Sequence, residues 1–153
     1  MKVFSVKAED THDSMARITN FLTAKGFSVK SMAVGQAEEE GTTRITIAAD
    51  IDDREARQMY HGLDKLISVV SVTHLNKVST VIRQLVLLKV TCYGKKTHSV
   101  TDLVSEWGGK VLSDDSRTVV CELMEAKNSI VDIVSTLKRY GTVEVAQSGL
   151  VAL

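Results

Sequence analysis

The sequence predicts an α+β protein built from two tandem ferredoxin-like βαββαβ domains. Segments in which apolar residues alternate are interleaved with segments in which they recur every three or four positions. The resulting order of strand, helix, strand, strand, helix and strand occurs twice along the 153 residues. Paired segments of the two halves also echo one another, as in FLTAKGFSVKSM (21–32) and LVSEWGGKVLSD (103–114).

The first repeat is expected over residues 1–76. Its first helix carries apolar residues such as Ile18 and Phe21 on one face and ends at Gly26, because glycine is preferred just beyond a helix. Its second helix shows an apolar stripe that runs from Ala56 to Ile67. In chain order, the expected elements are a strand over 2–8, the first helix, strands over 27–35 and 42–50, the second helix from Asp52 and a strand over 69–75.

The second repeat is expected over residues 80–153, after a short connection at Asn76–Thr80. Its first helix places Val100 and Val104 on one face and stops at Gly108, and Trp107 falls on the same face, which indicates core packing. In chain order, the expected elements are a strand over 83–93, this helix, strands over 110–114 and 117–123, a helix with apolar residues from Ile130 to Leu137 and a strand over 142–147.

Each repeat predicts a four-stranded antiparallel sheet with both helices on one face. Val, Ile and Ala are common at both the odd and the even positions of the strands, so the opposite face of the sheet is also apolar and needs cover. A second subunit would bury that face, so we expect a homodimer at least.

The composition argues against several classes of protein. The 19 basic and 19 acidic side chains cancel, whereas a nucleic-acid binder normally carries a basic stripe, and no segment is left over for a helix-turn-helix. No apolar run approaches the ~18 residues of a membrane span, and residues 1–5 lack the apolar region of a signal peptide. We therefore expect no nucleic acid, no membrane and a cytoplasmic location.

Residue types that carry catalysis or bind metals form no recognisable motif. The chain has no Gly-x-Ser-x-Gly, no glycine-rich phosphate loop and no histidine pair at metal-ligand spacing. Cys92 and Cys121 lack Cys-x-x-Cys spacing and are expected to be buried. The three carboxylates of AEEEG (37–41) are expected in a solvated hairpin turn. The sequence therefore predicts no catalytic residue and no metal site.

Four longer stretches carry a resemblance to a known family. They are GFSVKSMAVGQAEEEGTTRITIAADID (26–52), LDKLISVVSVTHL (63–75), RQLVLLKV (83–90) and EVAQSGLVAL (144–153). The first two resemble the ACT domain, and the last two the C-terminal domain, of the small regulatory subunit of acetolactate synthase (acetohydroxyacid synthase). ACT domains occur in many amino-acid-responsive proteins, so the second half is what selects this family.

The resemblance implies a regulatory subunit with no catalytic activity of its own. Its partner would be the large, catalytic subunit of acetolactate synthase, which would hold thiamine diphosphate, Mg²⁺ and often FAD, so this chain needs no cofactor. The small subunit raises that activity and transmits feedback inhibition by a branched-chain amino acid, typically valine, in branched-chain amino acid biosynthesis. The resemblance implies effector sites between the ACT domains of two protomers, and we expect the homodimer to form through these domains, because their apolar sheet needs cover.

The effector site implied by the resemblance includes the turn 10–15 and the start of the second strand. A helix N-terminus supplies unpaired N–H groups for an effector carboxylate. The family pattern at the turn is Asn-x-Pro-Gly-x-Leu, whereas residues 10–15 read Asp-Thr-His-Asp-Ser-Met, and Ser28 stands where the family often has Asn. The expected effector-binding residues are Asp10, Asp13, Ser14, Met15, Ser28, Val29 and Gly35.

The turn has two interpretations. Asp13 stands where the family has glycine, and its carboxylate could cap the helix, occupy the N–H groups and repel an anionic effector. Feedback control would then be weakened. In the second interpretation, the site still binds a branched-chain amino acid.

An alternative function also stays open. Gln84 stands where the family has an acid, and Gln147 where it commonly has an arginine. These departures favour a free-standing tandem ACT sensor that binds an amino acid and acts on another protein.

Overall fold

The computed structural model describes residues 1–9, 12–75, 80–94, 96–124 and 129–153. It forms two compact units, one of Met1–Ile82 with Gly149–Leu153 and one of Arg83–Ser148. The chain therefore returns to the first unit for residues 149–153, which the predicted boundary at 80–153 had grouped with the second repeat. Most of the expected connection, residues 76–79, lies outside the described residues.

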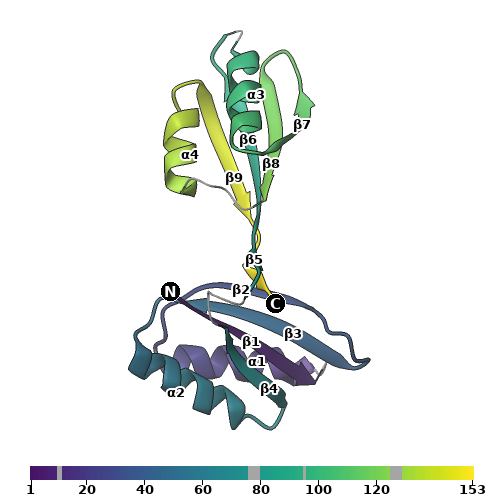
Figure 1. Ribbon diagram of the computed structural model, residues 1–153, viewed down its shortest axis with the longest axis vertical. Helices are drawn as coiled ribbons and strands as arrows, with labels where there is room; N and C mark the ends of the chain where they lie inside the picture. Colours follow the sequence, from purple (N-terminus) through teal and green to yellow (C-terminus); the bar gives the residue numbers. More distant parts are fainter. Residues whose placement is uncertain (10–11, 76–79, 95, 125–128) are drawn as a thin grey trace. The chain divides into compact units, whose positions relative to one another are not determined.

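Unit 1 has the predicted βαββαβ order. Its elements are β1 (Lys2–Glu9), α1 (His12–Ala24), β2 (Val29–Gln36), β3 (Thr42–Ala49), α2 (Asp53–Asp64) and β4 (Val69–Leu75). The strands form an antiparallel sheet in the order β2-β3-β1-β4, and both helices lie on one face of it (Figure 1). The predicted fold class is confirmed for this half of the chain.

The start of α2 follows from a reciprocal pair of side-chain hydrogen bonds. The Glu55 amide donates to the Asp52 carboxylate at 2.7 Å, and the Asp52 amide donates to the Glu55 carboxylate at 3.0 Å. Asp52 is therefore the N-cap, and the helix starts within one residue of the predicted position. The predicted apolar stripe is wrong at its far end, because α2 ends at Asp64 and Ile67 lies in the following turn with 92% of its surface exposed.

The core of unit 1 lies between the helices and one face of the sheet. Alternate residues of the central strands, such as Phe4 and Ile47, are fully buried against Ile18 of α1 and Met59 of α2. The residues next to them in sequence point to the helix-free face, because successive side chains of a strand lie on opposite faces of the sheet.

The segment 149–153, here called the return segment, covers part of the helix-free face of unit 1 (Figure 1). Within it, β10 (Val151–Ala152) pairs with β5 (Ile82–Arg83). Ala152 is 2% exposed and forms a small apolar cluster with Val3 and Ala48. The sequence predicted that a second subunit would cover this face, and part of the cover comes from the same chain.

The return segment also approaches β2 closely. The Leu150 amide donates to Ser31 Oγ at 3.3 Å. A Cβ added at Gly149 would lie 2.8 Å from the Met32 carbonyl oxygen and 2.9 Å from the Ala33 Cβ. A residue without a side chain is therefore required where this segment meets the strand.

Unit 2 repeats the same topology. Its elements are β6 (Leu85–Cys92), α3 (Thr97–Glu106), β7 (Lys110–Asp114), β8 (Thr118–Met124), α4 (Ile130–Leu137) and β9 (Gly141–Gln147), with the strand order β7-β8-β6-β9. Trp107 packs against the core, as predicted. Cys92 and Cys121 are free and buried, and burial raises the pKa of the Cys121 thiol to about 11, so these thiols are the small core residues that the sequence predicts.

Candidate functional site

The residues expected at the turn 10–15 differ widely in exposure. Asp10 lies outside the described residues. Asp13 is in the first turn of α1 with 76% of its side chain exposed, and its Oδ2 lies 3.6 Å from Arg17 Nη2. Ser14 is 3% exposed and Met15 packs against the core of unit 1. Of Asp13, Ser14 and Met15, Asp13 is the exposed residue, and Met15 is partly buried.

The residues expected on the second strand lie at its two ends. Ser28 precedes β2, and its carbonyl accepts a hydrogen bond from the Asp50 amide at 2.8 Å. Val29 packs against the core. Gly35, near the other end of β2, is exposed, and no atom lies within 4 Å of the position that a Cβ would take. Space is therefore open beside Gly35.

The strand register separates the expected residues into two groups. Val29 lies opposite Ala49, which lies opposite Lys2, so the start of β2 is beside the start of β1. Gly35 lies opposite Arg44 at the end where β1 leads into α1 and Asp13. The two ends of β2 are about 20 Å apart for an extended strand. One small effector cannot contact both groups within a single protomer.

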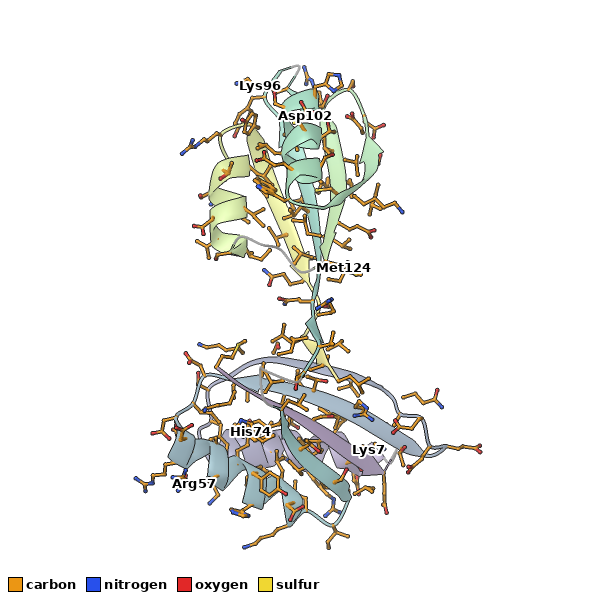
Figure 2. The ribbon with its side chains drawn as sticks, in the orientation of Figure 1. Lys7, Arg57, His74, Lys96, Asp102 and Met124 are labelled. Carbon is orange, nitrogen blue, oxygen red and sulfur yellow. The ribbon has the colours of Figure 1, made fainter. Side chains whose placement is uncertain are left out.

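A cluster of charged side chains, which sequence reasoning missed, lies at the Gly35 end of the sheet. Glu38, in the β2–β3 hairpin, pairs with Lys7 of β1 and with Arg44 of β3, whose Nη2 is 3.0 Å from Glu38 Oε2. Arg44 Nη1 also donates to Ser5 Oγ at 3.0 Å. Figure 2 labels Lys7 on β1. Both cations are therefore already engaged by a carboxylate of the same chain.

The charged cluster predicts an unusually acidic glutamate. The hydrogen bond from Lys7, with further help from a backbone N–H and Arg44, lowers the pKa of Glu38 from its ordinary 4.5 to about 2. Because the folded-state pKa is depressed, the stabilisation is complete above pH 4.5 and is lost as the pH falls from about 4.5 to about 2. Carboxyl ¹³C NMR should show the Glu38 midpoint near 2, and Lys7→Ala should move it upward. A midpoint near 4.5 in the unmodified chain would contradict the cluster.

The two departures expected to favour a free-standing sensor contact one another in unit 2. Gln84 Nε2 lies 3.4 Å from Gln147 Oε1 and donates to the Ser148 carbonyl at 2.7 Å. An acid and an arginine at these positions would form a charge pair, and two glutamines form a neutral hydrogen-bonded pair instead. The two departures therefore lie in contact with one another.

The described residues contain neither a metal-binding group nor a membrane-spanning helix. No group of three or more His, Cys, Asp or Glu side chains is placed to hold a metal ion among them. Across the same residues, no helix is both long and apolar enough to cross a bilayer.

Comparison with known proteins covers both units. A family model described as the AHAS small subunit-like ACT domain matches residues 4–71, and one described as the small subunit of acetolactate synthase matches residues 83–153. The acetolactate synthase small subunit of Aquifex aeolicus is 30% identical over 152 residues, which cover 99% of this chain and 79% of that protein. The chain belongs to the acetolactate synthase small-subunit family.

Other members of the small-subunit family match nearly the whole chain. The acetolactate synthase small subunit of Mycolicibacterium smegmatis is 28% identical over 149 residues, covering 97% of this chain and 88% of that protein. The crystal structure of the acetolactate synthase small subunit from Thermotoga maritima superposes with a TM-score of 0.85 at 25% identity, covering 99% of this chain and 95% of that one. The resemblance inferred from the sequence, including the ACT domain, is confirmed.

Proposed function

We propose that this chain is the non-catalytic regulatory subunit of acetolactate synthase, which binds and activates the large catalytic subunit. The observation that carries the proposal is the match of both family models, in order, over residues 4–71 and 83–153. Thiamine diphosphate, Mg²⁺ and FAD would belong to the partner, and this chain would contribute protein surface and an effector site. Gln84 and Gln147, the two departures that favour a free-standing sensor, contact one another and so count as one local change.

The effector site is proposed to form between the ACT domains of two protomers. The separation of Val29 from Asp13 along the sheet supports this, because a second protomer could bring the start of its β2 to the turn of the first. The open space beside Gly35, on an edge strand, would admit a neighbouring chain. A branched-chain amino acid such as valine would place its carboxylate at the N-terminus of α1.

Feedback inhibition through this site is proposed to be weak. The Asp13 carboxylate lies in the first turn of α1, where the N–H groups and the positive end of the helix dipole would otherwise attract the effector carboxylate. Arg17 offsets part of that negative charge. The remaining charge still opposes an anion at the same helix turn.

The helix-free face of unit 2 is the surface proposed to contact the catalytic subunit. Leu87 and its cross-strand neighbour Ala146 point away from the buried core residues of β6, and Leu87 is 38% exposed. Met124, at the end of β8, is 64% exposed (Figure 2). The same face carries charge as well: Glu122 of β8 lies opposite Leu87, and Lys89 and Glu144 form an ion pair at 2.8 Å. A face that mixes apolar and charged side chains is compatible with a protein interface.

The test is to mix the purified chain with the cognate large subunit and measure acetolactate formation. We expect a clear rise in activity and little inhibition by valine. Leu87→Glu should weaken subunit binding about tenfold or more, because it replaces an exposed apolar side chain with a second carboxylate opposite Glu122. The matched control is Val131→Glu, on the exposed side of α4, which should activate normally.

Two outcomes would contradict these proposals. Failure of the unmodified, folded chain to bind or activate the large subunit in solution would favour the free-standing sensor. Equal loss of activation by Leu87→Glu and Val131→Glu would remove the helix-free face as the contact surface, and would leave the regulatory role intact.

A further inference from the structure

A hollow on the helix side of unit 1 has no role in the function proposed above. It has a volume of about 460 Å³, within the range of small-molecule sites. Its lining residues come from the second half of α1, the loop after it and the second half of α2, and they are Phe21, Lys25, Phe27, Gln58, His61, Gly62 and Lys65. The turn 10–15 leads into the other end of α1, where Asp13 is about 18 Å from Lys25 along the helix axis.

The floor of the hollow is aromatic. The rings of Phe21 and Phe27 lie 5.9 Å apart at 53°, and both are half-buried. Gly62 makes this possible, because a Cβ there would lie 2.1 Å from Phe21 Cζ. The absent side chain lets the Phe21 ring lie directly against α2 and leaves its edge open to a ligand.

The rim of the hollow is basic and polar. Lys25, Lys65 and His61 are exposed around the aromatic floor, and Gln58 adds an amide. No acidic side chain lines the hollow, and within the described residues neither lysine is in an ion pair. By contrast, Lys2 and Lys7 of the same unit are paired with carboxylates. Two cations without a counter-charge thus stand over an apolar surface.

We propose that this hollow binds a small aromatic carboxylate. The two lysines would attract the carboxylate, and the ring would stack on Phe21 and Phe27. A neutral aromatic compound would lose the ionic part of this recognition, and acetate would lose the stacking part. The lining of the site shares no residue with the turn 10–15 or with the surface of unit 2 that is proposed to contact the large subunit.

The experiment is an amide NMR titration of the full chain with phenylacetate. A ligand of about ten non-hydrogen atoms should bind with a dissociation constant of about 1 mM. We expect the shifts to be concentrated in residues 21–27 and 58–65. Phenylacetamide and acetate, the neutral and the non-aromatic controls, should each bind at least about tenfold more weakly.

The variant that tests the rim is Lys25→Gln with Lys65→Gln. The double replacement should weaken phenylacetate binding about tenfold, from two screened ionic contacts, without changing the rest of the spectrum. The matched control, Lys110→Gln with Lys138→Gln, removes two exposed lysines of unit 2 and should bind normally.

Three results would overturn the site. They are the absence of shifts in both segments at about 10 mM ligand, equal affinity for phenylacetamide, and unchanged affinity in the Lys25 and Lys65 double variant. Each is distinct from failure of the proposed function, because activation of the large subunit is measured without phenylacetate.

Discussion

Replacing Ala152 with Asp should lower the free energy of unfolding of unit 1 by about 3 kcal/mol. Ala152 is 2% exposed and packs with Val3 and Ala48 on the helix-free face of the sheet. A carboxylate cannot stay ionised there without a partner, so the return segment must detach or the charge must be desolvated. Detachment would expose the apolar cluster to water. Because the total free energy of unfolding of a native protein is about 5–15 kcal/mol, either detachment or desolvation of the charge would remove a large share of it.

Urea denaturation followed by circular dichroism would measure this effect. The matched control is Leu153→Asp, because the next residue is 78% exposed and its replacement should change stability by less than about 0.5 kcal/mol. Similar values for the two variants would show that the return segment does not stabilise unit 1. A large loss in Ala152→Asp alone would show that residues far apart in sequence complete one domain.

Replacing Asp13 with Gly should strengthen valine binding by about tenfold or more. The change removes a carboxylate from the first turn of α1 and frees the approach to its N–H groups. Because the Asp13 side chain is 76% exposed and lies near Arg17, solvent and the guanidinium already reduce its repulsion. The gain should therefore fall at the lower end of the 10- to 1,000-fold that a buried charge would produce.

Calorimetry with valine, together with inhibition of the reconstituted enzyme, would measure this gain. Asp13→Asn is the informative control, because it removes the charge and keeps the size of the side chain. Recovery in both variants would assign the effect to charge, and recovery in Asp13→Gly alone would assign it to steric access. Tight, stoichiometric valine binding by the unmodified chain would show that Asp13 does not obstruct the site.

Local sequence patterns predicted the secondary structure closely. The strands at 69–75 and 110–114 have their predicted bounds, and α2 begins directly after Asp52, where the helix was expected to start. The errors fall at the ends and breaks of elements, which the spacing of apolar residues does not predict. Ile67 continued an apolar stripe past the end of its helix, and the predicted strand 83–93 is divided at Gln84 into β5 and β6.

The candidate site was predictable only in part. The turn before α1 was identified because helix termini have recognisable capping residues and because the family pattern is local. The sequence could not show that Gly35 lies at the end of the sheet that leads to Asp13 and that Val29 lies at the far end. That placement depends on the register of β2 on β3 and of β3 on β1. It also missed the pairing of Glu38 with Lys7 and Arg44, which joins residues from three segments.

By itself, the sequence determined the two βαββαβ units and the family, because strand and helix periods and turn residues act over a few neighbouring positions. Only the tertiary structure decided that residues 149–153 return to the first unit and that two phenylalanines and two lysines surround one hollow. Such contacts join positions tens of residues apart. They depend on which surfaces remain uncovered after the local elements have formed, and no local pattern encodes that.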